Sequence, residues 1–202
     1  MKRPLLIAMG VGLLMGVVPA LVLVVAPQLG HQPGARQQTT GKALIGGPFS
    51  LVDPSGKRVT EKDFAGRPML VYFGFTNCPD VCPSGLLVIA AALDKLGEKS
   101  ANLTPVFISL DPERDTPEVM GQYVKSFHPR IVGLTGSLDE VTAAAKAYRI
   151  YFTKVADEKS PGSYSVDHSS YMYLMDGSGA FLKHFPHTVG VDQLADELAK
   201  AL

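Results

Sequence analysis

Two cysteines, Cys78 and Cys82, are the residues of this chain with the most distinctive chemistry. They are the only cysteines in 202 residues, and they lie within the segment Thr76–Pro83, between an apolar run and a predicted helix. Side chains four residues apart on a helical turn share a face, so the two sulfurs can form a disulfide or bind one soft metal ion. The positive partial charge at a helix N-terminus also favours thiolate over thiol. The spacing predicts redox chemistry or metal binding and leaves both open.

A metal ion held by two thiolates needs a further ligand, and histidine is the expected donor. His168 is the candidate. It stands in a polar group, Ser165–Ser170, directly before the apolar run Tyr171–Met175, so it should project from the edge of a sheet or from a loop beside it. Asp167 is a candidate for orienting the imidazole, although an ordinary solvated carboxylate in a turn is the favoured interpretation. The remaining histidines are expected in a tether or at the surface: His31, His128, His184 and His187.

The acidic segment Asp111–Pro117 is a second group of candidate functional residues. It follows a predicted strand, Val106–Leu110, and should therefore lie at the same edge of the sheet as the cysteines. Thr116 and Pro117 have the residue types of a helix N-cap and of the first helical position. Asp111 has no such role, and we hypothesise that it shapes the site or a partner-facing surface.

Apolar runs of strand length alternate with segments of helical length along most of the chain. Strands are predicted at residues 69–75, 106–110, 131–134, 171–175 and 180–185, and helices at 86–96, 117–127, 139–148 and 191–202. The turn sequence Asp53–Gly56 separates two further short strands, 49–52 and 57–60, in an opening hairpin. The pattern predicts an α/β fold with a mixed central sheet.

The N-terminal part differs in composition from the remainder. No charged or strongly polar side chain occurs from Leu5 to Ala26, and as a helix this run would be about 33 Å long, enough to cross a bilayer. Lys2 and Arg3 precede it, and the positive-inside rule places the rest of the chain outside the cytoplasm. A cleaved signal peptide is the alternative. We expect a membrane anchor at residues 1–27, a flexible linker at 28–44 and one folded domain at 45–202.

The formal charge of the chain is zero, but the charges are unevenly distributed. Four basic residues are the only charges before Asp53, so the remainder carries 15 basic and 19 acidic residues. A mildly acidic domain without a basic stripe argues against nucleic acid as a partner. A disulfide between cysteines only four residues apart would add little stability, because it would close a very short loop. The composition therefore favours metal binding or redox chemistry over a stabilising disulfide as the role of the cysteine pair.

Three segments occur in a characteristic order along the chain. They are Gly74–Pro83, which contains both cysteines, then Asp111–Pro117, then Val166–His168. Together, and with the single predicted N-terminal span, they resemble the Sco (SenC) family of copper-binding assembly factors for cytochrome c oxidase. The resemblance covers roughly residues 45–200.

This resemblance implies a thioredoxin-like fold preceded by one transmembrane helix, with copper, as Cu(I) or Cu(II), bound by Cys78, Cys82 and His168. The implied function is that of a metallochaperone, and thiol-disulfide oxidoreductase activity stays open. It would deliver copper to the dinuclear centre in the copper-bearing subunit of cytochrome c oxidase, with another periplasmic copper chaperone as a candidate donor.

Two further expectations concern location and an alternative function. Only four residues, Met1–Pro4, precede the apolar run, which leaves no room for a transit peptide. The expected location is a bacterial inner membrane, crossed once, with the domain facing the periplasm. The alternative function is a periplasmic thiol-disulfide oxidoreductase that reduces the copper-site cysteines of the oxidase. The usual redox motif has two residues between its cysteines, whereas Cys78 and Cys82 have three.

Overall fold

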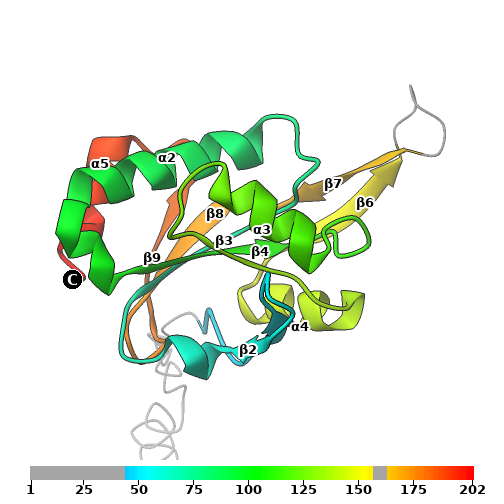
Figure 1. Ribbon diagram of the computed structural model, residues 1–202, viewed down its shortest axis with the longest axis horizontal. Helices are drawn as coiled ribbons and strands as arrows, with labels where there is room; N and C mark the ends of the chain where they lie inside the picture. Colours follow the sequence, from blue (N-terminus) through cyan, green and yellow to red (C-terminus); the bar gives the residue numbers. More distant parts are fainter. Residues whose placement is uncertain (1–43, 157–162) are drawn as a thin grey trace, which may run out of the picture. The chain divides into compact units, whose positions relative to one another are not determined.

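The computed structural model describes residues 44–156 and 163–202. Its central sheet has five strands in the order β5-β4-β3-β8-β9 (Figure 1). β3 (Met69–Gly74), β4 (Thr104–Ser109) and β5 (Val132–Leu134) run parallel. β8 (Tyr171–Met175) pairs antiparallel with β3, and β9 (Phe181–Pro186) pairs antiparallel with β8. The predicted α/β fold with a mixed central sheet is confirmed.

Helices cover both faces of this sheet (Figure 1). On one face lie α2 (Val81–Leu96), α3 (Pro117–Lys125) and α5 (Val191–Ala199), with α2 and α5 side by side. On the other face lie α4 (Leu138–Ala147) and the opening hairpin of β1 (Ser50–Val52) and β2 (Arg58–Thr60). Two short 3-10 helices, η2 (Glu61–Phe64) and η3 (Gly97–Asn102), complete the main connections.

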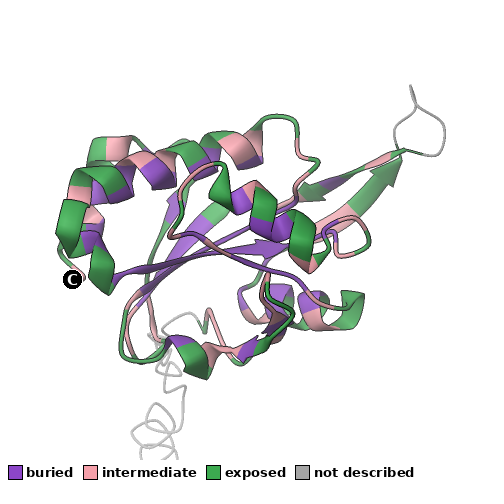
Figure 2. Ribbon diagram, viewed as in Figure 1, coloured by how far each residue is buried: buried purple, intermediate pink, exposed green. Residues whose placement is uncertain are grey.

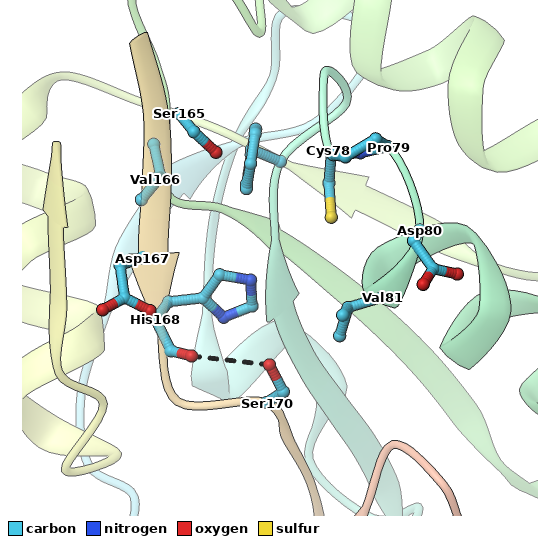
Figure 3. A pocket seen from close by; sticks show the side chains of 10 residues that line it. Cys78, Pro79, Asp80, Val81, Ser165, Val166, Asp167, His168 and Ser170 are labelled. Carbon is cyan, nitrogen blue, oxygen red and sulfur yellow. Dashed lines mark hydrogen bonds between the residues drawn. The ribbon is translucent and has the colours of Figure 1, made fainter. Parts of the chain in front are cut away.

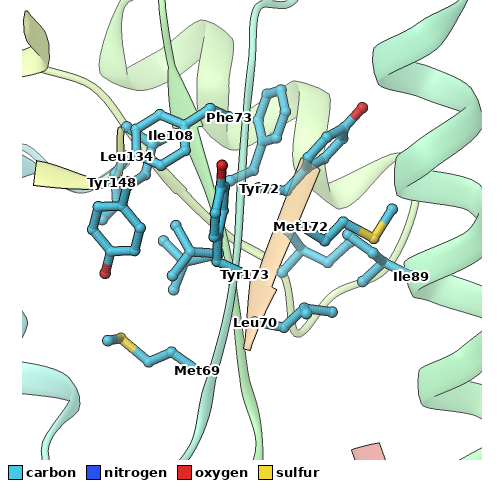
Figure 4. Packing of buried hydrophobic residues seen from close by; sticks show 14 of the residues in the cluster. Met69, Leu70, Tyr72, Phe73, Ile89, Ile108, Leu134, Tyr148, Met172 and Tyr173 are labelled. Carbon is cyan, nitrogen blue, oxygen red and sulfur yellow. The ribbon is translucent and has the colours of Figure 1, made fainter. Parts of the chain in front are cut away.

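β3 is buried on both faces, as its unbroken apolar sequence predicts. Tyr72 faces α2, where its hydroxyl donates a hydrogen bond to the carbonyl of Val81 (3.1 Å). Phe73 faces the other side and packs against Tyr148, with ring centroids 5.3 Å apart (Figure 4). Figure 2 shows that buried residues are concentrated along the central strands and the inward faces of the helices. The loop that follows β3 therefore starts from a rigid strand.

α2 begins at Val81, five residues before the helix predicted from Leu86. Pro83 and Gly85 obscure the helical pattern in this stretch. Pro83 is nevertheless in the first turn, where its missing N–H is not needed. Gly85 provides room for a tyrosine, because a β-carbon there would lie 2.7 Å from the hydroxyl of Tyr72. This earlier start places Cys82 inside the helix.

The start of α3 agrees with the sequence. The hydroxyl of Thr116 accepts a hydrogen bond from the backbone N–H of Val119 (3.3 Å), and Pro117 is the first helical residue. This is the predicted N-cap, which satisfies one of the free donors of the first turn.

Besides the central sheet and the opening hairpin, the structure contains a further two-stranded sheet that was not predicted. β6 (Phe152–Ala156) and β7 (Tyr164–His168) pair antiparallel with each other, with Phe152 opposite His168. The residues that join the two strands, 157–162, lie outside the described part of the chain. This β6–β7 hairpin is the element that carries His168.

The predicted membrane anchor at residues 1–27, and the linker apart from Leu44, lie outside the described residues. Among residues 44–156 and 163–202, no helix combines the length and the apolar character needed to cross a bilayer. The predicted division into anchor, linker and domain at 45–202 therefore stays a prediction.

Candidate metal centre

Cys78 and Cys82 lie at the carboxyl end of β3, where the chain turns into α2. The backbone N–H of Cys78 donates to the carbonyl of Phe75 (3.3 Å), and the N–H of Cys82 donates to the sulfur of Cys78 (3.3 Å). That second N–H is one of the donors a helix leaves free in its first turn. The sulfur of Cys78 thus acts as a capping acceptor. Both residues are free thiols, Cys78 partly exposed and Cys82 fully buried.

The two thiols differ in their affinity for a proton. A hydrogen bond with the Cys82 side chain, aided by His168 and working against burial, lowers the pKa of Cys78 to about 4. The pKa of Cys82 is raised by its hydrogen bond to Cys78 and by burial. At neutral pH the pair therefore holds one proton, on Cys82, and presents one thiolate, on Cys78. A partly exposed thiolate of this kind is both a nucleophile and a metal donor.

Cys82 can lie against the sheet because residue 74 is a glycine. A β-carbon at Gly74 would be 2.7 Å from the sulfur of Cys82 and 2.8 Å from the ring of Phe107. Both distances are well inside van der Waals contact, so a larger residue would displace the sulfur or the ring. The last residue of β3 therefore determines how deeply this sulfur is seated.

His168 approaches the cysteines from the β6–β7 hairpin. Its Nε2 is 3.7 Å from the sulfur of Cys82, and its Nδ1 is 3.1 Å from the carbonyl oxygen of Ser169. A carbonyl only accepts, so a hydrogen bond at Nδ1 requires the proton to be on that nitrogen. Nε2 is the ring nitrogen that faces the sulfur. Phe75 packs edge-on against the imidazole, with centroids 6.0 Å apart.

An open pocket of about 200 Å³ lies between the cysteine loop and the hairpin. Figure 3 shows the sulfur of Cys78 and the ring of His168 pointing into this space from opposite sides. Two carboxylates lie at its margin, Asp80 beside the cysteines and Asp167 beside the histidine. The pocket gives a small ligand, or a donor group from another molecule, access to Cys78.

Asp115, in the acidic segment identified from the sequence, is a buried carboxylate that fixes the start of the cysteine loop, a contact that the sequence did not predict. Asp115 is 0% exposed and accepts hydrogen bonds from the N–H (3.1 Å) and hydroxyl (2.5 Å) of Thr76 and from the hydroxyl of Ser109 (2.6 Å). Burial raises the pKa of Asp115, and these hydrogen bonds oppose that shift. The position of Asp115 after β4 could have indicated its closeness to the cysteine loop, because the carboxyl ends of adjacent parallel strands meet at one edge of the sheet.

Asp111 lies at this edge too, as predicted, and is fully buried. Its carboxylate accepts a hydrogen bond from the hydroxyl of Tyr164 (2.7 Å) and pairs with the Nε of Arg114. These contacts connect the end of β4 to the first residue of β7. Sequence analysis assigned no role to Arg114 or Tyr164, because the contacts that join Tyr164 to Arg114 and Asp111 span 50 and 53 residues.

None of the other described histidines lines the pocket between Cys78 and His168. His184 is exposed, as predicted, and His187 is half-buried. The surface prediction for His128 was wrong: its side chain is only 14% exposed, and its Nε2 is 3.5 Å from a carboxylate oxygen of Asp94. A histidine that ends a helix next to a proline can pack inward when such a partner is present. His31 lies outside the described residues.

The described residues contain no group of three Cys, His, Asp or Glu side chains in metal-holding geometry. Cys78 and His168 line the pocket, whereas Cys82 is buried and its sulfur lies 3.7 Å from His168 Nε2; the three predicted ligands are not arranged around a single point. For an ion such as zinc, bonds of about 2.3 Å to sulfur and about 2.0 Å to nitrogen put the two donor atoms at most about 4.3 Å apart, and closer where the bonds are bent. The 3.7 Å between Cys82 and His168 is compatible with such sharing. The three-ligand set stays a prediction.

Fold and site together define a mixed α/β domain with a cysteine pair at the start of a helix and a histidine opposite it. The model of the SCO1/SenC family matches residues 37–202. The chain belongs to this family.

Individual relatives agree with this assignment. The Arabidopsis thaliana protein "SCO1 homolog 1, mitochondrial" is 50% identical over 165 residues, which are 81% of this chain and 49% of that protein. The chain thus spans about half the length of that relative. Among solved structures, copper-bound ScoI of Arabidopsis thaliana is 49% identical with a TM-score of 0.73, covering 78% of this chain and 97% of that one. Copper-bound ScoI of Bradyrhizobium japonicum is 42% identical with a TM-score of 0.73, covering 78% and 99%.

Proposed function

We propose that this protein binds one copper ion through Cys78, Cys82 and His168. The observation that carries the proposal is the approach of His168 Nε2 to the Cys82 sulfur, at 3.7 Å, from a hairpin separate from the cysteine loop. Two thiolates and one imidazole suit soft Cu(I), and imidazole also suits Cu(II). Two solved relatives, 49% and 42% identical, hold copper, which supports the choice of metal.

The unequal thiols determine how copper binding depends on protons. Cys78 is already a thiolate at neutral pH, because its pKa is about 4. Cys82 carries a proton that must leave before its sulfur can bind the ion, since metals bind thiolates. Copper binding near neutral pH therefore releases about one proton. A disulfide between the two sulfurs would remove both thiolates, so loading requires the reduced protein.

We further propose that the protein passes its copper to the dinuclear centre of cytochrome c oxidase during assembly. Membership of the SCO1/SenC family supports this role, and so does the open pocket beside Cys78, where an incoming donor can bind before an existing one leaves. The proposal includes anchoring by residues 1–27 in a bacterial inner membrane, a domain facing the periplasm and a separate periplasmic protein as copper source. Transfer of an ion needs no catalysis.

Thiol-disulfide exchange is the second candidate function, and one observation favours it. A partly exposed thiolate at Cys78 beside the buried, protonated Cys82 is the arrangement of an attacking thiol and a resolving thiol. Exchange does not need an imidazole at position 168. Metal-free protein that reduces a disulfide in the oxidase copper domain with repeated turnover, and equally well with His168→Ala, would favour this function.

A copper titration of the reduced full chain tests the proposed ligands. We expect one bound copper per chain, and a thiolate charge-transfer band in the Cu(II) form. His168→Ala should raise the dissociation constant for copper by at least about 10- to 100-fold, the loss found even for groups that only support a metal ligand.

His184→Ala is the matched control, because it removes an exposed histidine outside the pocket. It should leave both the affinity and the spectrum unchanged. Equal copper affinity and equal spectra in wild type and His168→Ala would exclude the three-ligand site.

A further inference from the structure

The attachment of the β6–β7 hairpin to the domain decides where His168 lies. In the described part of the chain, β6 and β7 form their own two-stranded sheet and are not members of the central one. Val166 is their one fully buried residue; the others are exposed or half-buried. Neither main-chain pairing with the central sheet nor extensive core packing therefore fixes the hairpin. Its orientation depends on particular side-chain contacts.

The strongest of these contacts converge on Arg114. Its Nε donates to the carboxylate of Asp111, which is 0% exposed. Its Nη1 donates to the backbone carbonyl of Tyr164 (3.1 Å), and its guanidinium carbon lies 3.8 Å from the centroid of the Tyr164 ring. The Tyr164 hydroxyl closes the cycle by donating to Asp111 (2.7 Å). Arginine is suited to this role because its planar fork donates in several directions while its face stacks on an aromatic ring.

The guanidinium of Arg114 also lies near Phe75, the ring that packs against the imidazole of His168. Its carbon lies 6.0 Å from the centroid of the Phe75 ring, and Phe75 in turn packs edge-on against His168. Arg114 thus contacts the first residue of the strand that ends in His168 and the ring that limits movement of the imidazole. No other cation in the described residues contacts both Tyr164 and Phe75.

We infer that Arg114 is a positioning residue for the third copper donor. By holding Tyr164 against the buried Asp111, it keeps β7 in the place where His168 Nε2 lies beside Cys82. We call the contacts among Arg114, Asp111 and Tyr164 the clamp. This inference rests on the proposed copper function, because the residue that the clamp positions is a ligand of the proposed copper site. Arg114 itself donates nothing to the metal.

A second, exposed ion pair joins the same hairpin to the segment between β4 and α3 and provides a control. Lys154 on β6 is 2.7 Å from Glu113, and its ammonium is 4.6 Å from the centroid of the Tyr164 ring. The side chains are 36% and 59% exposed, and pairs so accessible to solvent contribute little. Glu113→Gln removes the charge of this pair and its electrostatic interaction with Arg114, but it keeps a side chain that can hydrogen-bond to Tyr164 and leaves the contacts among Arg114, Asp111 and Tyr164 in place.

The principal test is Arg114→Lys. Lysine keeps a positive charge near Asp111 but has a single donor nitrogen in place of the guanidinium fork and lacks the planar face. In the full chain, the dissociation constant for copper should rise by about 10- to 100-fold. The nitrogen hyperfine coupling in the electron paramagnetic resonance spectrum of the Cu(II) form should weaken or become heterogeneous, while the thiolate charge-transfer band remains. Tyr164→Phe, which loses only the hydroxyl, should change both in the same direction by less, and Glu113→Gln should change neither.

A double-mutant cycle separates positioning from a general structural role. In a His168→Ala background, Arg114→Lys should have no further effect on copper affinity, because the group that it positions is gone. An equal loss in both backgrounds, or the same loss with Glu113→Gln, would overturn the inference. If Arg114→Lys does not fold, Tyr164→Phe serves in the same cycle. Failure of the proposed function is distinguishable, since His168→Ala alone would then leave copper affinity unchanged.

Discussion

Cys78 and Cys82 are the same residue type, four positions apart, yet their surroundings give them different chemistry. Cys78 is partly exposed, and its sulfur accepts a hydrogen bond at the start of α2, whereas Cys82, in the first turn of α2, is buried against the end of β3. Their spacing and their place at a helix start could be predicted from the sequence. Which of them keeps its proton could not, because that depends on burial and on a glycine in the neighbouring strand.

The low pKa of Cys78 has a direct consequence for its reactivity. We expect its rate of alkylation by iodoacetamide to stay nearly constant between about pH 5 and 8 and to fall below about pH 4, because the group remains a thiolate above its pKa of about 4. An ordinary thiol, with a pKa of about 8.5, would react about tenfold faster with each pH unit over that range. Mass spectrometry of the reduced, metal-free protein gives the rate at each cysteine.

Cys82→Ala provides the control for this measurement. It removes the side-chain hydrogen bond that contributes most to lowering the pKa of Cys78, so the fall in rate should move to higher pH. A wild-type rate that climbs tenfold per unit from pH 5 to 8 would show that Cys78 is an ordinary thiol.

Gly74 supplies the second prediction at this scale. Gly74→Ala places a methyl group 2.7 Å from the Cys82 sulfur and 2.8 Å from Phe107, and such overpacking costs about 1–3 kcal/mol. We expect lower thermal stability and, because the sulfur is displaced, weaker copper binding. Gly190→Ala is the control for binding, since an added methyl group there meets nothing within 4 Å. Unaltered copper affinity in Gly74→Ala would mean that the depth of Cys82 does not matter to the site.

At the scale of elements, the strands that are buried along their length could be predicted from the sequence, and those that bury little could not. β3 and β4 are buried along their whole length, and their apolar runs revealed them. The β6–β7 hairpin buries little and is held by Arg114 and its partners, so its sequence carries no comparable pattern. The position of His168 could therefore not be derived from periodicity. The choice of His168 as a ligand came from resemblance to a family. The structure shows contacts between residues distant in the sequence that place it beside Cys82.

At the scale of the whole molecule, the proposed site joins segments that are distant along the chain. Cys82 and His168 are 86 residues apart, whereas Cys78 and Cys82 are neighbours in any conformation. An unfolded chain can still offer the two sulfurs to copper, but it can recruit the imidazole only by closing a long loop. Copper bound by all three groups should therefore favour the folded state strongly, and copper bound by the two sulfurs alone should not.

This difference predicts how copper changes thermal stability. At a free copper concentration about 100 times the dissociation constant, a ligand that binds only the folded state adds about 2.7 kcal/mol, or about 5–10 °C in the melting temperature of a chain this long. We expect calorimetry of the reduced full chain to show a shift of that size. His168→Ala, held at the same multiple of its own dissociation constant, should show a much smaller shift, because its remaining sulfurs also bind copper in the unfolded chain. Equal shifts in the two proteins would mean that His168 does not link copper binding to the fold, and the ion would then belong to the cysteine loop alone.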